Sequence, residues 1–296
     1  QERIWKEKDT IHVNFSNQVQ MQLLKLSKKR WNYLAQLVRL NKYLSEAGVC
    51  SRREADRLIE TGRVTVDGQR AQTGMRIVPG QVVKVGNKVV SKQDEMIVLA
   101  VNKPRGIVCT EERRERDSIV RFLNYPVRVT YIGRLDKDSH GLLLMTNNGD
   151  IINKMMRAAN KHEKEYKVTV DKEITEDFLK KMAAGVPILD TVTRPCTVKK
   201  IGKYTFSIIL TQGLNRQIRR MCEALGYEVK DLLRVRVMNI TLDGLKDGQY
   251  RKLTDQELNE LYDQLKDSSV LPGGKYQEQW AAAQDNRTRH GKGKKR

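Results

Sequence analysis

The sequence predicts an α+β protein with two folded domains, and three observations support this prediction. Helix-like and strand-like segments are mixed without strict alternation, which favours a largely antiparallel sheet with flanking helices. The chain has 296 residues, and a domain typically runs about 100–200 residues, so two domains are expected. A polar, non-periodic segment over 91–96 is typical of a linker. We therefore expect a small α/β domain over 38–90 and a larger domain over 97–266.

Composition and charge narrow the function classes. The chain carries 56 Lys and Arg against 36 Asp and Glu, a formal net charge of +20. Such a basic protein needs an anionic partner, and nucleic acid is the leading candidate. No apolar run reaches the roughly 18 residues of a transmembrane helix, so no membrane association is expected. The four scattered cysteines form no Cys-x-x-Cys pair, which argues against a zinc site and favours the reducing cytoplasm.

The first domain is expected to contain two short helices followed by small strands. Apolar residues at helical spacing over 40–47 predict the first helix. The second begins at a capping box, in which the Ser51 hydroxyl accepts from the Glu54 amide and the Glu54 carboxylate reaches back. Valines then alternate with polar residues over 64–66, and the Asp-Gly pair at 67–68 signals a hairpin turn.

Basic residues cluster at the start of the second helix. Arg53 and Arg57 are four residues apart and share a helical face with Arg52 nearby. The free amides of a helix N-terminus also favour phosphate. The cluster therefore predicts a phosphate-binding surface, although a charged helix face can equally be an ordinary solvated surface.

The second domain continues the mixed pattern to a second capping box over Thr254–Glu257, which opens the last helix. Asp117 is expected to cap the first helix of this domain. The expected strands cover 97–101, 127–131, 142–145, 166–170, 204–210 and 235–242, and the expected helices cover 117–123, 151–159, 175–184, 215–225 and 254–265.

The two ends of the chain fall outside these patterns. Residues 1–37 are expected to form an extension of unclear role, either poorly ordered or an extra helix. The last ten residues carry six positive and no negative charges, so the tail over 267–296 is expected to be disordered. It could add nonspecific RNA affinity or have no specific role.

One polar loop stands out between two strand-like runs. It contains Asp136 and Asp138 with the basic residues Arg134 and Lys137. Loops held between strands are favoured places for catalysis, and an ionised carboxylate there can serve as a nucleophile or a general base. From the residue pattern alone, the same loop could be an ordinary turn. The adjacent His140 is expected to be a loop residue rather than a base.

Two further segments could contribute to a site. Tyr166 begins a strand, and its planar ring could stack on a base and still form a hydrogen bond. A glycine loop after residue 212 enters a helix whose start carries Arg216, Arg219 and Arg220. One of these arginines could pair with a carboxylate while the others meet phosphates. No phosphate-binding glycine motif and no histidine pair with metal spacing is present.

Three segments together resemble the RsuA/RluA-type pseudouridine synthases. Residues 133–147 are similar to the family signature around its catalytic aspartate, 164–166 to its second motif, and 215–221 to its third. Residues 39–85 resemble an S4 RNA-binding domain. The resemblance implies a catalytic domain built on a mainly antiparallel sheet with flanking helices, after the S4 domain, and it covers roughly 38–266.

The resemblance implies the chemistry of the site. Asp136 would initiate cleavage of the glycosidic bond, either by attacking the sugar or by removing a sugar proton. Tyr166 would stack against the base and could help to deprotonate C5, and Arg219 would hold Asp136 ionised and oriented. Isomerisation gains no atom, so no cofactor and no metal are expected.

Within the family, three stretches most resemble the branch that modifies 23S ribosomal RNA: 163–170, 184–189 and 214–222. The expected function is therefore conversion of one uridine near the peptidyl transferase centre by a cytoplasmic monomer, with tRNA as a possible second partner. Alternatives are a synthase of small-subunit rRNA or tRNA, an S4 protein without catalysis, and a glycosidase using both aspartates. The residues expected to contact RNA are Arg39, Lys42, Arg52, Arg53, Arg57, Arg134, Arg216 and Arg220.

Overall fold

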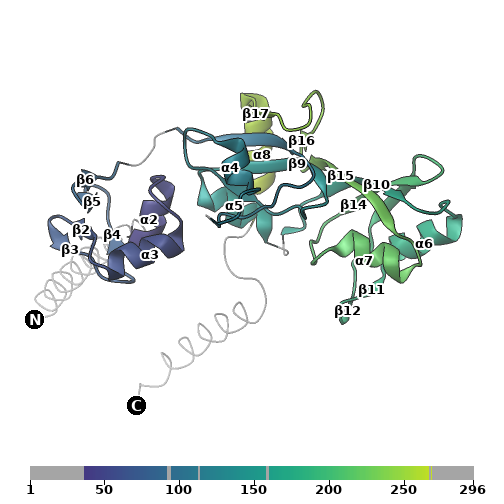
Figure 1. Ribbon diagram of the computed structural model, residues 1–296, viewed down its shortest axis with the longest axis horizontal. Coiled ribbons are helices and arrows are strands. Elements are labelled where there is room, and N and C mark those ends of the chain that lie inside the picture. Colours follow the sequence, from purple (N-terminus) through teal and green to yellow (C-terminus); the bar gives the residue numbers. More distant parts are fainter. Residues whose placement is uncertain (1–36, 92–94, 113, 158–159, 267, 269–296) are drawn as a thin grey trace, which may run out of the picture. The chain divides into compact units, whose positions relative to one another are not determined.

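The computed structural model describes residues 37–91, 95–112, 114–157, 160–266 and 268. The chain forms two compact units, Gln1–Asp94 and Glu95–Arg296 (Figure 1). The expected N-terminal extension and basic tail lie outside the described residues, apart from Leu37 and Ser268. In the described ranges, no helix has the length and apolar character needed to cross a bilayer.

The first unit packs two helices against short antiparallel strands. Its core is built from buried aliphatic residues of both helices and of β2 and β5, among them Leu44, Ile59, Val64 and Val83. Strand β1 pairs with β4, and a second sheet has the order β3-β2-β5-β6. The helices are α2 (Leu40–Glu46) and α3 (Arg52–Glu60), and the strands are β1 (Val38–Arg39), β2 (Val64–Val66), β3 (Gln69–Arg70), β4 (Arg76–Ile77), β5 (Val83–Val85) and β6 (Lys88–Val89).

The expected capping box of α3 forms only in part. The Ser51 hydroxyl accepts from the Glu54 amide at 3.3 Å, as expected. The Glu54 carboxylate does not complete the box, because it accepts from Arg57 at 3.1 Å instead. The Asp67–Gly68 turn joins β2 to β3 with both residues at positive φ, which is the turn that the sequence predicts.

A nine-stranded sheet organises the second unit, with the main order β13-β14-β10-β15-β9-β7-β17. Strand β16 pairs with β15, and β8 pairs with β9. Among its ladders only β9–β15 is parallel, so the expected mainly antiparallel sheet is confirmed. The strands are β7 (Val98–Lys103), β8 (Thr130–Ile132), β9 (His140–Thr146), β10 (Lys164–Val170), β13 (Thr197–Lys200), β14 (Thr205–Leu210), β15 (Val229–Val237), β16 (Ile240–Thr241) and β17 (Tyr250–Lys252), with a separate hairpin of β11 (Pro187–Ile188) and β12 (Thr191–Val192).

Helices cover the sheet in three groups, each with its own core. Helices α6 and α7 pack on β10, β14 and β15 through residues such as Phe178, Met221 and Phe206. Helices α5 and α8 pack on one face of β7 and β9, and α4 packs on the other. The helices are α4 (Ile119–Leu123), α5 (Gly149–Met156), α6 (Glu176–Ala184), α7 (Gln217–Ala224) and α8 (Asp255–Leu265).

Some boundaries differ from those expected. Ser118, not Asp117, caps α4, and its hydroxyl accepts from the Arg121 amide. Strand β15 begins at Val229 rather than at 235, because its first residues pair with the end of β10. The second capping box is confirmed at α8, where the side chains of Thr254 and Glu257 each accept from the other's backbone amide.

The sheet forks at β9. Its first residues pair with β15 through His140 and Gly141, whereas its last residues pair with β8. Gly141 lies at the fork with φ +100°, and a Cβ there would come within 2.4 Å of the Arg234 carbonyl oxygen. The loop between β8 and β9, which contains Asp136, therefore leads into β9 at the fork.

Gly141→Ala should destabilise the second unit strongly. The substitution combines a left-handed backbone with a clash against the backbone of β15, and we expect a loss of about 3 kcal/mol in the free energy of unfolding. Gly244→Ala is the matched control, because Gly244 also has positive φ but no other atom lies within 4 Å of where its Cβ would be. Denaturant unfolding of both variants checks this; equal losses would mean that the fork tolerates a side chain.

Candidate active site

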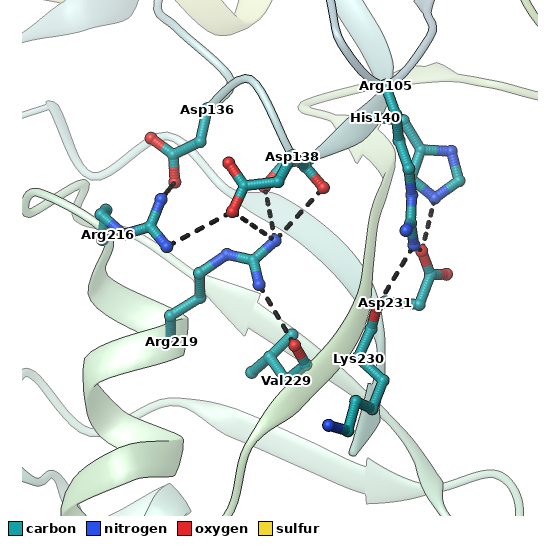
Figure 2. Close-up of polar contacts among 10 residues, drawn as sticks. Arg105, Asp136, Asp138, His140, Arg216, Arg219, Val229, Lys230 and Asp231 are labelled. Carbon is teal, nitrogen blue, oxygen red and sulfur yellow. Dashed lines mark hydrogen bonds and ion pairs between the residues drawn. The ribbon is translucent and has the colours of Figure 1, made fainter. Parts of the chain in front are cut away.

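Two carboxylates and two arginines meet above the fork (Figure 2). Asp136 lies in the β8–β9 loop, with its side chain about one third exposed. The Arg216 guanidinium reaches both acids: Nη1 lies 3.5 Å from Asp136 Oδ2, and Nη2 lies 3.4 Å from Asp138 Oδ2. Arg216 precedes α7 in a left-handed backbone conformation (φ +49°), a strained geometry that is common at functional sites.

Arg219 contacts the loop at Asp138 and Ser139 instead of binding the Asp136 carboxylate. Its Nη2 donates to the Asp138 carbonyl and to the Ser139 hydroxyl, each at 3.3 Å, and its Nη1 donates to the Val229 carbonyl of β15 at 3.2 Å. Its nearest carboxylate contact is Asp138, at 3.6 Å. The structure does not bring Arg219 to the Asp136 carboxylate as expected: Arg216, the residue before α7, lies there instead.

The two acids are held differently. Partial burial raises the pKa of Asp138, but hydrogen bonds from its own backbone amide and from Arg216, with the charge of Arg219, outweigh burial and lower it overall. Asp138 is thus the more heavily anchored acid, and its carboxylate meets both arginines. Among the described residues, the Asp136 carboxylate meets Arg216 alone, at 3.5 Å, and stays available to a substrate.

Tyr166 lies in β10, between two packed clusters. It packs against the core under α7 and also against the cluster that includes Leu135, the residue before Asp136. In the sheet it stands opposite Arg234 of β15. Tyr166 thus packs against the cluster that contains Leu135, the neighbour of Asp136 in the loop.

A second polar cluster ties β15 to the start of β9. Asp231 of β15 pairs with Arg105, and its Oδ1 lies 2.8 Å from His140 Nε2 (Figure 2). Burial and the charge of Arg105 lower the pKa of His140. His140 is not a loop residue as expected: it is the first residue of β9, and it contacts β15 through Asp231.

Lys103 supports the loop from below, and the sequence patterns did not single it out. Its side chain is fully buried, and Nζ donates to the carbonyls of Pro104 and Ile107 at 2.8 and 2.7 Å. This fixes the turn whose Gly106 amide donates to the Lys137 carbonyl of the loop. Burial lowers the pKa of Lys103. Its position two residues after the apolar run 97–101, within the same strand, was the signal in the sequence.

The basic residues expected to meet RNA fall into two groups. In the first unit, Arg39, Arg52, Arg53 and Arg57 are exposed, while Lys42 is half-buried and lies 3.5 Å from Glu46. In the second unit, Arg134 and Arg216 are exposed. Arg220 turns back to Asn215, donating to its carbonyl oxygen and its side-chain oxygen. Arg220 therefore shapes the loop before α7.

Comparisons with known proteins agree with this architecture. Residues 97–224 match the RNA pseudouridylate synthase family, and residues 38–83 match the S4 domain. The chain is 57% identical over 234 residues to the dual-specificity RNA pseudouridine synthase RluF of Escherichia coli K12, covering 78% of this chain and 81% of that protein. It is 35% identical to ribosomal large subunit pseudouridine synthase B of Bacillus subtilis, covering 75% and 95%.

A solved structure shows the same fold. A crystal structure of a pseudouridylate synthase superposes with a TM-score of 0.57 at 27% identity, covering 76% of this chain and 99% of that one. The family and the S4 domain expected from the three motifs are thus confirmed. The RluF type is also the branch to which the stretches 163–170, 184–189 and 214–222 pointed, and that assignment is confirmed too.

Proposed function

The chain belongs to the RNA pseudouridine synthase family, and from this premise we propose that it isomerises one uridine of 23S ribosomal RNA near the peptidyl transferase centre. The similarity to RluF and to a large-subunit synthase supports the ribosomal target. The single observation that carries the site assignment is the loop at the fork, where an accessible Asp136 faces Arg216 while Arg219 fixes the loop.

The catalytic roles follow from this geometry. Asp136 starts cleavage of the N1–C1′ bond, as a nucleophile at C1′ or as a base at the sugar. Tyr166 stacks on the uracil, and Arg219 acts as a positioning residue through the loop backbone. The uridine must leave its stack to reach Asp136, at a cost of a few kcal/mol that stacking and backbone contacts offset.

Flanking RNA is bound by the basic residues on both units. Arg134 and Arg216 lie at the rim of the site, where they can meet phosphates next to the flipped uridine. Because the E. coli relative is named dual-specificity, we include a second RNA, tRNA, among the substrates. The protein acts as a cytoplasmic monomer, and its isomerisation needs neither cofactor nor metal.

The S4 unit supplies affinity rather than chemistry. Its residues 38–90 carry 10 Lys and Arg against 5 Asp and Glu. Replacing Arg52, Arg53 and Arg57 together with Ala should weaken RNA binding and flatten its dependence on salt. Each lost phosphate contact lowers the slope of log K against log salt by roughly 0.7–0.9.

The matched control replaces the exposed Arg76, Lys84 and Lys88, which removes the same charge from the strands of the unit. Filter binding of both triple variants from low to moderate salt measures the slopes. If the two variants keep the same slope, the α3 face does not bind phosphate.

The target is tested by mapping carbodiimide-stable positions in ribosomal RNA from cells with and without the gene. We expect one position of 23S rRNA to lose its modification in the deletion strain and to regain it on complementation. A lost position in 16S rRNA or in tRNA alone would contradict the proposed large-subunit target.

A further inference from the structure

An arginine with a spare hydrogen-bond donor lies buried at the fork, beneath the proposed site. Arg234 is 2% exposed, and its Nε donates to the Leu142 carbonyl of β9 at 2.6 Å. Its Nη2 is buried and has no hydrogen-bond partner within the described part of the chain. Leaving a charged donor unsatisfied in the interior is costly, so the vacant donor indicates a partner that arrives with the substrate.

The position of Arg234 connects it to the proposed site. In the sheet it stands opposite Tyr166 on one side and Gly141 on the other, and Gly141 in turn stands opposite Lys103. Residues opposed in an antiparallel pair have side chains on the same face of the sheet. Arg234 and Tyr166 therefore lie on the same face. The row runs across four adjacent strands and crosses β9 at Gly141, its second residue after the loop of Asp136.

Positive charge is in excess in this row. Arg234 and Lys103 both donate to backbone carbonyls, and neither forms an ion pair with any carboxylate of the described residues. The charge of Arg234 also acts on Lys164: burial and this charge lower the pKa of Lys164 to about 8. A buried cation without a counter-ion stabilises negative charge that develops beside it.

We propose that Arg234 is a substrate-contacting residue whose free Nη2 donates to a carbonyl oxygen of the flipped uracil and stabilises the negative charge that the base acquires when it leaves the sugar. This inference rests on the proposed function. It goes further, because it assigns a partner to the departing base, whereas Asp136 and its arginines act on the sugar side.

The charge follows from the balance of the reaction. When the N1–C1′ bond breaks, its electron pair remains with uracil, shared among N1, O2 and O4, whether Asp136 has bonded to C1′ or has taken a proton from C2′. C5 then supplies the pair for the new C5–C1′ bond and loses its proton, and N1 gains a proton. On the first route the C1′–Asp136 bond breaks as C5–C1′ forms, and its electron pair returns to the carboxylate; on the second route the C2′ proton is returned. The product is an isomer, and the base is anionic only in between.

The test compares two RNAs in single-turnover reactions with excess enzyme. One carries uridine at the target position, and the other carries 5-fluorouridine, whose base is a better leaving group and needs less stabilisation. For Arg234→Gln we expect uridine consumption to slow by at least about 100-fold, as when a donor to a developing anion is removed. With the 5-fluorouridine RNA, the loss of rate relative to wild type should be about tenfold smaller. Binding of the RNA should be unchanged.

Arg236→Gln is the matched control, since Arg236 lies on the same strand but pairs with Glu163 and Glu165; its rate should stay within about threefold of wild type. Thermal melting of both variants shows whether they fold. If Arg234→Gln is unfolded, Arg234→Lys, which keeps the charge, is compared in its place. Equal deficits with the two RNAs would mean that Arg234 only braces β9 and would overturn the proposal. An inactive wild-type protein would instead overturn the proposed function.

Discussion

Asp136→Asn should abolish pseudouridine formation in a protein that still folds and still binds RNA. The amide has almost the same shape but can act neither as a nucleophile nor as a base, so the rate should fall by about 10³-fold or more. Asp136 is partly exposed, and in the described part of the chain its one ion pair is with Arg216 at 3.5 Å, so the change in stability should stay within about 0.5 kcal/mol. Tritium release from C5-labelled uridine in RNA measures the rate.

Asp138→Asn is the matched control in the same loop. Its carboxylate meets Arg216 and Arg219, but the Arg219 bond to its carbonyl remains after the substitution. We therefore expect a loss within about tenfold. If the Asp138 variant is the inactive one and the Asp136 variant turns over normally, the two carboxylates have been assigned to the wrong roles.

Arg219→Ala should be the second most damaging change, far worse than Arg220→Ala. Arg219 joins the loop to β15 through three backbone and hydroxyl contacts, and its loss should displace Asp136. A misplacement of about 1 Å can cost on the order of 100-fold in rate. The Arg220 side chain donates only to Asn215 among the described residues, so its loss should be mild.

The pH dependence of turnover distinguishes positioning of the loop by Arg219 from a direct Arg219–Asp136 ion pair. Because Arg219 meets the loop backbone and Asp138, raising the pH should not restore the activity of Arg219→Ala. Turnover of both variants between about pH 6 and 9, above the ordinary pKa of a carboxyl group, gives the comparison. Partial recovery at high pH would instead support the ion pair, and a worse Arg220→Ala variant would mean that the third motif is wrongly aligned.

Much of the fold was accessible from the sequence, because its signals are local. The helix ending at Gly185 and the capping box at Thr254 both depend on residues a few positions apart. The β11–β12 hairpin was missed, since each strand has two residues and its turn places Leu189 and Asp190 at positive φ. No alternation can show in so short a segment.

The motifs predict Asp136, Tyr166 and Arg219 as site residues, and the structure places Arg219 against the loop that contains Asp136. The partner of Asp136 was not predictable, because helical spacing fixes directions only within a helix and Arg216 stands before α7. Arg234 and Lys103 were overlooked because a basic residue is normally exposed. The alternation of Arg234 with the buried Leu232 was the signal that it faces inward.

The most direct test of the central claim is to incubate an unmodified 23S rRNA fragment with the purified protein and to measure RNA mass, free uracil and carbodiimide-stable positions together. Isomerisation through Asp136 predicts one carbodiimide-stable uridine, an unchanged mass and no free uracil, with the stable position lost in Asp136→Asn. Release of free uracil would indicate a hydrolase, and binding without any new stable position would indicate an RNA-binding protein. Either result would contradict the account.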